Sequence, residues 1–342
     1  MQDASAILNA HGGCIDAAAK LYPKAPQPWL DLSTGINPRP YPVPPIDPAL
    51  WHRLPLASDL DELLAAAAAY YGRPEGMRLV PVAGSESAIR LLPRIVRARR
   101  VGILGPTYPS HAAAWNAAGC VLADLSVLPD PTADLDGMVL VNPNNPDGRR
   151  HLAADLLDWA AAWTAAGHWL IVDEAFADVD PAVSLLAQPV LSPRLVVLRS
   201  LGKFFGLAGL RLGFIACCET VAARWLPLAG DWPISGPAAA IGAAALRDGD
   251  WIARTRQRLA EDRQRLDALL AAAGFAVLGG TDLFRLAEAP GHLADDCDLL
   301  GHFGRRGILV RGFSSAQRRI RFGLPGDDDA WRRLGEACLA LG

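Results

Sequence analysis

The chain has 342 residues, of which 51% are hydrophobic and 20% are charged, as in an ordinary soluble globular protein. Its 33 basic and 36 acidic side chains nearly balance, which gives no electrostatic argument for a nucleic-acid or membrane partner. The length suffices for one large domain or two of ordinary size, so it does not limit the chemistry.

The first 57 residues hold many of the prolines, as in the run Pro-Arg-Pro-Tyr-Pro-Val-Pro-Pro at 38–45. Proline fixes its own backbone and removes a hydrogen-bond donor, so residues 1–57 are predicted to form an extended arm that packs on something larger. The composition changes at Ser58. Ser58 and Asp61 form a capping-box-like start and Gly72 supplies a stop, which predicts a helix between them.

Short apolar runs then alternate with helical stretches. The runs are 101–104, 138–141, 169–172, 195–198 and 212–216, and helices are expected over 87–97 and 151–167. This alternation predicts an α/β fold with a large domain, residues 58–236, whose mainly parallel sheet lies between helices. Ligands of such sheets bind at the carboxyl ends of the strands.

The last part of the chain, residues 237–342, has a different pattern. It opens on a long amphipathic helix at 251–273 and ends on a closing helix, with short strands expected near 276–278, 283–286, 308–311 and 319–322. We therefore expect a smaller C-terminal α+β domain.

The six cysteines contain no Cys-x-x-Cys pair, and Cys217 and Cys218 are adjacent. This spacing suits neither a disulfide framework nor a zinc site, so we expect reduced thiols, no metal and a cytoplasmic location. The N-terminus lacks a basic region followed by an apolar stretch, and we find no uncharged apolar window of about 18 residues. Secretion and membrane insertion are therefore not expected.

Lys203 lies in a glycine-rich, otherwise apolar loop directly after the run at 195–198. Lysine is mostly a solvated surface residue, but Phe204, Phe205 and Leu207 would desolvate this one and favour a nucleophilic amine. A lysine that holds a carbonyl cofactor as a Schiff base needs such surroundings. We therefore predict that Lys203 carries pyridoxal 5'-phosphate (PLP).

Two further groups of residues are candidates for holding a phosphate. Ser200 and Arg211 offer a hydroxyl and a fixed guanidinium group, although Arg211 would also suit a structural salt bridge. Gly84, Ser85 and Glu86 precede a predicted helix, whose N-terminal N–H groups attract anions.

Three polar residues suit contacts with the cofactor ring. Asp173 follows an apolar strand, where a buried carboxylate pairs with a protonated pyridine nitrogen, although such aspartates also cap helices. Asn145, in Asn-Pro-Asn-Asn-Pro-Asp-Gly, presents an amide to a ring oxygen, with a plain turn as the alternative. Tyr108 would lie flat against an aromatic cofactor or simply belong to the core.

The chain resembles fold-type-I PLP-dependent transferases of the aminotransferase family over nearly its whole length. The matched motifs are Asn-Pro-Asn-Asn-Pro, Asp-Glu-Ala-Phe, and Ser-Leu-Gly-Lys with Gly-Leu-Arg-Leu-Gly. The resemblance implies the same roles that the residues themselves suggest. Lys203 is the Schiff-base lysine, Asp173 the partner of the ring nitrogen and Asn145 the partner of the ring oxygen. Tyr108 is the stacking residue, and Ser200 and Arg211 are phosphate ligands. Enzymes similar to this one are homodimers, which makes a second copy of the chain the expected partner.

The arm, with His11-Gly-Gly-Cys14 and the run Asp-Leu-Ser-Thr-Gly-Ile-Asn-Pro at 31–38, is similar to that of threonine-phosphate decarboxylases of cobalamin biosynthesis. Their reaction turns L-threonine O-3-phosphate into (R)-1-aminopropan-2-ol O-2-phosphate. Phe176 agrees, because many aminotransferases have a tyrosine there that donates to the ring oxygen, and phenylalanine donates nothing.

The same resemblance assigns substrate contacts to two arginines and to the arm. Arg319 is matched to the substrate carboxylate and Arg311 to its phosphate, helped by His11 and Gly12, while Asn145 contacts the substrate as well as the ring. Two arginines suit a substrate with two anions, although arginines on edge strands also form plain surface ion pairs.

The sequence departs from the family pattern at two places. Asp147 stands where a threonine is usual, and Gly35 stands where some relatives have an asparagine that contacts the substrate. Two other functions stay open: a histidinol-phosphate aminotransferase, and a PLP-binding regulatory module without catalysis. A dinucleotide site is not expected, because no Gly-x-Gly-x-x-Gly opens a helix after the first strands.

Overall fold

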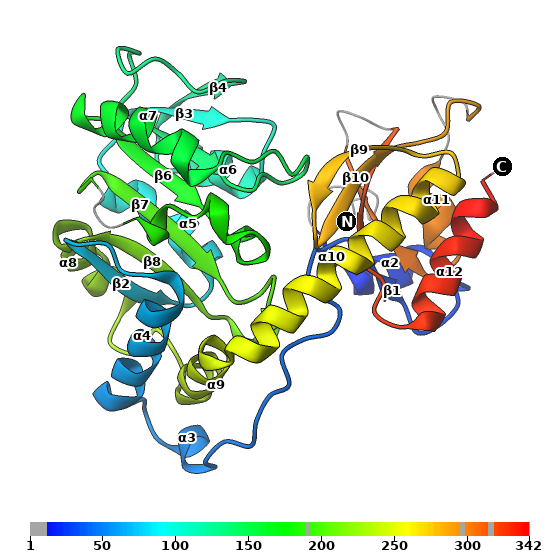
Figure 1. The fold of residues 1–342 in the computed structure, drawn as a ribbon, viewed down its shortest axis with the longest axis horizontal. Coiled ribbons are helices and arrows are strands. Elements are labelled where there is room, and N and C mark those ends of the chain that lie inside the picture. Colours follow the sequence, from blue (N-terminus) through cyan, green and yellow to red (C-terminus); the bar gives the residue numbers. More distant parts are fainter. Residues whose placement is uncertain (1–11, 189–191, 294–297, 314–317, 342) are drawn as a thin grey trace. The chain divides into compact units, whose positions relative to one another are not determined.

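The computed structural model describes residues 12–188, 192–293, 298–313 and 318–341. The fold divides into two compact units, whose elements are labelled in Figure 1. The larger unit comprises residues 40–145 and 149–253, and the smaller comprises residues 1–39, 146–148 and 254–342. These divisions fall at other positions than the predicted domain boundaries, since the first part of the arm is built into the smaller unit.

The larger unit contains a seven-stranded sheet in the order β2-β8-β7-β6-β5-β3-β4. Strand β8 runs antiparallel to both of its neighbours, β2 and β7, and the other neighbouring pairs are parallel. The prediction of a mainly parallel sheet is therefore confirmed. In chain order the strands are β2 (Met77–Val82), β3 (Arg100–Leu104), β4 (Val121–Leu125), β5 (Gly137–Val141), β6 (Trp169–Asp173), β7 (Leu195–Ser200) and β8 (Gly213–Cys218).

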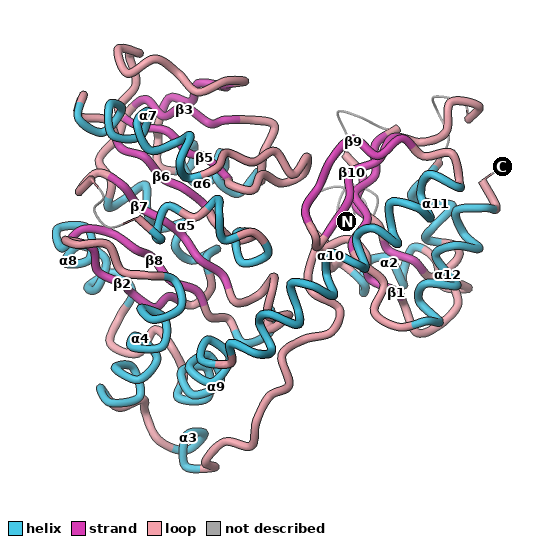
Figure 2. Tube along the Cα trace, in the orientation of Figure 1, coloured by secondary structure: helices cyan, strands magenta, loops and turns pink. Residues whose placement is uncertain are grey.

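Helices alternate with most of these strands along the chain, as Figure 2 shows. The α-helices that lie wholly in this unit are α3 (Ala49–His52), α4 (Ala57–Tyr71), α5 (Ser85–Ile95), α6 (Pro109–Ala117), α7 (Ala153–Ala165), α8 (Glu219–Ala229) and α9 (Gly236–Arg247). Short 3₁₀ turns follow β6 and β7: η1 (Ala177–Val179), η2 (Pro181–Val183), η3 (Leu185–Ala187) and η4 (Ala208–Leu210).

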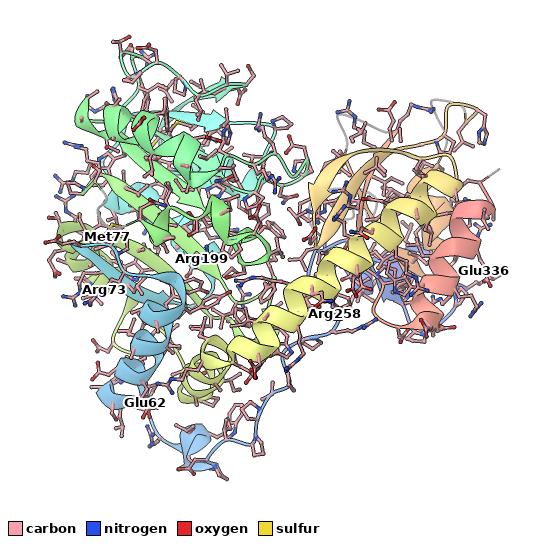
Figure 3. All side chains as sticks on the ribbon, viewed as in Figure 1. Glu62, Arg73, Met77, Arg199, Arg258 and Glu336 are labelled. Carbon is pink, nitrogen blue, oxygen red and sulfur yellow. The ribbon has the colours of Figure 1, made fainter. Side chains whose placement is uncertain are left out.

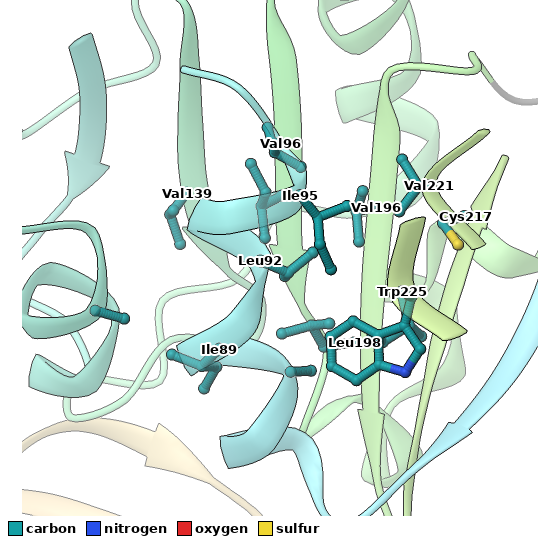
Figure 4. Close-up of a cluster of buried hydrophobic side chains, with 14 of the residues drawn as sticks. Ile89, Leu92, Ile95, Val96, Val139, Val196, Leu198, Cys217, Val221 and Trp225 are labelled. Carbon is teal, nitrogen blue, oxygen red and sulfur yellow. The ribbon is translucent and has the colours of Figure 1, made fainter. Parts of the chain in front are cut away.

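One face of the sheet is covered by α5, α6 and α8, whose apolar side chains form a common core with alternate residues of the strands. Figure 4 shows Leu92 and Ile95 of α5 and Trp225 of α8 packed over Val196 and Leu198 of β7. Burial of this kind stabilises a fold by roughly 25 cal/mol per Å² of apolar surface. The core holds the carboxyl ends of the strands rigidly in register.

Helix α4 starts one residue earlier than predicted, and its cap is different. The backbone N–H of Leu56 donates to Asp59 Oδ2 at 2.8 Å, so Asp59 rather than Asp61 closes the first turn. Arg53 also donates to that carboxylate, at 2.6 Å. The helix ends at Gly72 as predicted, where φ is +80°.

The smaller unit combines a four-stranded antiparallel sheet, β12-β13-β10-β9, with a two-stranded parallel pair, β1-β11. The strands are β1 (Leu30–Asp31), β9 (Ala276–Thr281), β10 (Phe284–Glu288), β11 (Ile308–Leu309), β12 (Arg311–Gly312) and β13 (Arg319–Gly323). The helices are α2 (Ile15–Leu21), α11 (Leu299–Gly304) and α12 (Asp328–Leu339), and α10 (Gly249–Ala272) begins in the larger unit and ends here.

The N-terminal arm differs from the prediction. It is not extended throughout, because α2 and α3 lie within it.

The described cysteines are free thiols, and Cys297 lies outside the described residues. Among the helices that the structure describes, none has the length and apolar content needed to span a membrane.

Candidate active site

Asp173 and Ser200 end two neighbouring parallel strands, β6 and β7. Their side chains share a face of the sheet with Ile171 and Leu198, because alternate residues of a strand point the same way. That face is the one covered by α5 and α6. The predicted cofactor groups are therefore brought to one end of one face, where ligands of parallel sheets bind.

The carboxylate of Asp173 is buried, with 3% of the residue exposed, and both of its oxygens are engaged. Oδ2 lies 2.9 Å from Nε2 of His111, and Oδ1 accepts the N–H of Ala175 at 3.0 Å. His111 is itself buried and stands on α6. Sequence reasoning missed this histidine, although its place one turn after Tyr108 in a predicted site loop was a usable signal.

Tyr108 directly precedes α6, and its ring meets that of His111 edge-on, with centroids 6.3 Å apart. Its hydroxyl donates to Glu86 Oε2 at 3.2 Å. Burial raises the pKa of Tyr108 and the negative charge of Glu86 raises it further, so the phenol stays protonated. The side chain of Glu86 also accepts from Arg90 at 2.9 Å. A carboxylate cannot donate to a phosphate, so the predicted phosphate contact of Glu86 is assigned to its backbone N–H.

Gly84, Ser85 and Arg211 form a close cradle with Gly213. A Cβ added to Gly84 would lie 2.7 Å from Nη2 of Arg211, and one added to Gly213 would lie 2.9 Å from N of Ser85. Ser200 is paired with Gly213 across the β7–β8 ladder. Because Gly84 and Gly213 have no side chains, space remains between these segments. The first N–H groups of α5, the hydroxyl of Ser200 and the guanidinium group of Arg211 can converge there on a phosphate.

The backbone of Arg211 supports this assignment. Its φ of 54° and ψ of 48° put it in the left-handed region, where non-glycine residues are uncommon and where strain gathers at functional sites. Such a conformation persists because the surrounding structure holds it. The PLP phosphate therefore fits this cradle by geometry as well as by charge.

Lys203 follows β7 and is half-buried in apolar surroundings. Its Nζ lies 5.3 Å from the ring centroid of Phe176, a buried residue of the loop after Asp173. Phe204 and Phe205 are fully buried and meet edge-on, with centroids 5.1 Å apart. These contacts agree with the predicted desolvation of the amine.

The loop that carries Asn145 is closed by its neighbours. Asn142 donates to the carbonyl of His151 at 2.8 Å and accepts the N–H of the same residue at 2.9 Å. Asn144 accepts from Thr107 at 2.6 Å and donates to a backbone carbonyl at 2.9 Å. Asn142 and Asn144 therefore fix the loop, which suits Asn145 for the ring contact predicted for it.

A second polar cluster lies behind the site, on the opposite face of the sheet. Arg199 of β7, labelled in Figure 3, binds Glu174 at 2.7 Å and Asp178 at 2.5 Å, and all three side chains are at least 96% buried. Burial would lower the pKa of Arg199, but the two carboxylates raise it above its ordinary value. Because Arg199 precedes Ser200 and Glu174 follows Asp173, this cluster ties together the two strand ends that carry the site.

Asn145, also predicted to contact the substrate, belongs to the larger unit, and the other described residues with that predicted role belong to the smaller unit. A Cβ on Gly12 would lie 2.5 Å from the backbone oxygen of Ser33, whereas His11 lies outside the described residues. Arg311 is half-buried, and Arg319 is exposed with Nε 3.6 Å from Glu288.

Known proteins resemble this chain in sequence and in fold. The family model "Aminotransferase class I and II" matches residues 51–295. Threonine-phosphate decarboxylase from Pseudomonas aeruginosa is 43% identical, over 97% of this chain and 97% of that protein. A threonine-phosphate decarboxylase from Sinorhizobium sp is also 43% identical, over 97% of this chain and 98% of that protein.

Some of the more distant relatives have another activity in their names. Histidinol-phosphate aminotransferase from Shewanella amazonensis is 33% identical over 74% of this chain and 73% of that protein. The solved structure of histidinol-phosphate aminotransferase from Sinorhizobium meliloti in complex with pyridoxal-5'-phosphate has a TM-score of 0.77, with 19% identity over 96% of this chain and 95% of that one. This likeness confirms the predicted fold class.

Proposed function

Because this chain belongs to the aminotransferase class I and II family, we propose that it is a PLP-dependent decarboxylase acting on L-threonine O-3-phosphate. The products are carbon dioxide and (R)-1-aminopropan-2-ol O-2-phosphate. The observation that carries the proposal is the 43% identity to two threonine-phosphate decarboxylases over 97% of the chain. The site residues fit the cofactor that this activity needs.

When bound, PLP supplies an electron sink that makes the bonds at the substrate's α-carbon labile. The chain's own residues decide which bond breaks. Asp173 presents a negative charge to the ring nitrogen, and His111 keeps that carboxylate oriented. The cradle of Gly84, Ser85 and Arg211 anchors the phosphate, and the amine of Lys203 holds the cofactor and is available to return a proton.

Phe176 supports decarboxylation over amino transfer. Its ring is buried beside Lys203, and it has no hydroxyl with which to donate to the ring oxygen. Asn145 is then left as the side chain assigned to that oxygen. A site with fewer donors at this oxygen differs electronically from that of the many aminotransferases that have a tyrosine here.

The substrate carries a carboxylate and a phosphate, and the smaller unit supplies arginines for both. We propose Arg311 for the phosphate, with His11 and Gly12, and an arginine of β13 for the carboxylate, which the resemblance takes to be Arg319. An arginine that holds the carboxylate would orient its bond to the α-carbon for cleavage, and the cofactor would supply the electron sink.

The proposal is tested by incubating PLP-loaded protein with L-threonine O-3-phosphate and no oxo acid. Carbon dioxide and the phosphorylated aminopropanol are followed by mass spectrometry. We expect both products from the wild type and neither from Lys203→Ala, which also loses the visible absorbance of the lysine-bound cofactor. Turnover that persists in Lys203→Ala excludes the assignment of that lysine.

A second candidate function is histidinol-phosphate aminotransferase, the name of relatives at 31% and 33% identity, although another relative at 31% is named threonine-phosphate decarboxylase. That activity requires an amino-group acceptor. If the first assay yields no carbon dioxide, and histidinol phosphate with 2-oxoglutarate yields glutamate, the protein is an aminotransferase. If neither substrate pair reacts while PLP still binds, the non-catalytic regulatory module is the better account.

We further propose that the enzyme acts in cobalamin biosynthesis, in the cytoplasm, and as a homodimer. Both the pathway and the dimer follow from the family resemblance. Sedimentation equilibrium of the PLP-loaded protein tests the dimer, because it separates a mass of twice 36.4 kDa from that of a single chain.

A further inference from the structure

The turn that carries Lys203 is anchored by the two phenylalanines that follow it. The N–H of Gly206 donates to the carbonyl of Lys203 at 3.1 Å, which makes Phe204 and Phe205 the central residues of a tight turn. Both phenylalanines are fully buried. Glycines stand on either side of the three residues, at 202 and 206, and have no side chains that could fix the turn. The position of the lysine therefore depends on what packs around the two rings.

Trp251, in the first turn of α10, packs on both rings. Its ring stacks on that of Phe205, with centroids 5.6 Å apart and planes 14° from parallel. It also meets the ring of Phe204 edge-on, with centroids 5.6 Å apart and planes at 76°. Stacked and edge-to-face arrangements at such distances are the ones that aromatic pairs favour. One indole thus contacts both anchors of the turn.

Tyr41 fixes the indole from a third segment of the larger unit. Its ring meets that of Trp251 edge-on, with centroids 5.2 Å apart, and its backbone N–H donates to the carbonyl of Phe205 at 2.9 Å. The N–H of Trp251 donates to Asp248 Oδ1 at 2.9 Å, which caps the first turn of α10.

Asp248 also acts on the hydroxyl of Tyr41. Burial raises the pKa of Tyr41, and the negative charge of Asp248 and a side-chain hydrogen bond to it raise this pKa further. The phenol therefore stays protonated and donates to the carboxylate that caps the helix. Through Asp248 and the ring contact, Tyr41 and Trp251 hold each other in place.

We infer that Trp251 is a positioning residue for Lys203, supported by Tyr41. By holding the rings of Phe204 and Phe205, the indole places the turn so that the amine of Lys203 reaches the aldehyde carbon of PLP. The neutral amine and the aldehyde then form a C=N bond, and both amine hydrogens leave with the aldehyde oxygen as water. The inference rests on the role proposed for Lys203 and does not depend on the reaction that follows.

The test measures how fast this bond forms. Full-length protein from which the cofactor has been removed is mixed with saturating PLP, and the visible absorbance of the lysine-bound cofactor is followed by stopped flow. At saturation the rate constant reports the bond-forming step and not the affinity. The variants are Trp251→Leu and Trp251→Phe.

Trp159→Leu is the matched control. Trp159 of α7 is half-buried like Trp251, and it stacks with similar geometry, its centroid 5.5 Å from that of Trp163 and the planes 17° from parallel. Its stacking partner belongs to the same helix. The control therefore removes an equivalent aromatic contact whose partner is not in the turn of Lys203.

We expect bond formation to be about tenfold slower or more in Trp251→Leu, because a small displacement of a reacting group costs up to about a hundredfold in rate. Trp251→Phe keeps a ring for Phe205 and should stay within about threefold of the wild type. Trp159→Leu should stay within about twofold. A wild-type rate in Trp251→Leu, or equal slowing in Trp159→Leu, overturns the inference.

A second measurement separates the lysine from the rest of the site. In Lys203→Ala the cofactor is held without a covalent bond, and equilibrium dialysis gives its dissociation constant. Adding Trp251→Leu to this background should change the constant by no more than about twofold, because the group that Trp251 positions is absent. Equal loss of PLP affinity with and without Lys203 would mean that Trp251 supports the whole site, and this also overturns the inference.

Unfolding midpoints of all variants are measured first. If Trp251→Leu does not fold, Trp251→Met replaces it, since a flexible thioether fills the space without fixing the two rings. We again expect about tenfold slower bond formation, and a wild-type rate overturns the inference. If Lys203→Ala keeps the visible absorbance of the wild type, the role of Lys203 is wrong and the inference falls with it. Wild-type protein that forms the bond but releases no carbon dioxide contradicts only the proposed reaction.

Discussion

His111 and Asp173 meet inside the larger unit, with Nε2 of the histidine 2.9 Å from Oδ2 of the aspartate. Both side chains are at least 96% buried. A carboxylate only accepts hydrogen bonds, so Nε2 of His111 carries the proton. The direction of this N–H bond fixes the orientation of the Asp173 carboxylate. The group assigned to the ring nitrogen is therefore positioned by a residue that was not itself predicted to bind the cofactor.

Replacing His111 with phenylalanine keeps a ring of similar size and removes the donor. We expect the dissociation constant of PLP to rise about tenfold or more, because a hydrogen bond to a buried charged group contributes about 1.5–3 kcal/mol. Absorbance titration of the cofactor-free protein measures it. The control is His168→Phe, whose Nε2 bonds a backbone carbonyl at 2.8 Å away from the predicted ligands. Equal affinity in both variants would contradict a positioning role for His111.

Gly84→Ala tests the phosphate cradle. The new Cβ would lie 2.7 Å from Nη2 of Arg211, and the backbone φ of +77° is strained for alanine. We expect both a lower unfolding midpoint and weaker PLP binding.

Gly119→Ala is the matched control, because Gly119 has a φ of +81° but no atom within 4 Å of its added Cβ. It should lose stability by backbone strain alone, by about 1 kcal/mol, and bind PLP as the wild type does. If the two variants bind PLP equally well, the close approach of Gly84 to Arg211 has no bearing on the cofactor.

The buried cluster behind the site predicts a non-additive effect on stability. Arg199→Met leaves Glu174 and Asp178 buried without their cation, which costs about 3–5 kcal/mol. Burial already raises the pKa of Glu174, so this variant should recover stability as the pH falls and the carboxylates take up protons.

Adding Glu174→Gln and Asp178→Asn to Arg199→Met should restore most of the lost stability, because no unpaired charge then remains buried. Urea unfolding of the single and triple variants at several pH values measures this. A triple variant as unstable as Arg199→Met would show that the arginine acts by packing, for instance against Tyr71, whose ring centroid lies 4.3 Å from Cζ.

The sequence was sufficient for a mainly parallel sheet between helices, because buried parallel strands are continuous apolar runs. It was insufficient for β2, since Pro81 interrupts the apolar pattern. The structure explains this, as β2 is an edge strand and edge strands tolerate proline. Edge strand β4 was missed as well, because Asp124 breaks its apolar run.

The candidate site was predictable where a motif stood in one loop, and less so where two distant segments meet. Asp173 ends strand β6 and Lys203 lies in the loop after β7, so their neighbours in sequence are also their neighbours in space. Arg321 of β13 differs, because its contact with Ser33 joins residues 288 positions apart. Arg319 and Arg321 belong to the same short motif, and only the register of β13 shows that their neighbours on β10 are Glu288 and Leu286, respectively.

The loop that carries Asn145 provides a pH-dependent prediction through His151. Burial lowers the pKa of His151 below its ordinary value of 6.5, and the positive charge of Arg149 lowers it further. The unfolded chain therefore binds this proton more readily than the folded one. Stability is complete above pH 6.5 and falls as the pH drops from there toward the lowered pKa.

His151→Phe removes the titrating group but keeps the backbone groups that bond Asn142. We expect the difference in unfolding free energy between pH 7.5 and pH 5.5 to be smaller in this variant than in the wild type, by about 1 kcal/mol or less for a half-buried group. Urea unfolding at the two pH values measures it. The control His52→Phe alters an exposed histidine and should keep the wild-type difference. A wild-type difference in His151→Phe would mean that other groups, such as His302, whose pKa burial also lowers, carry the acid sensitivity of the fold.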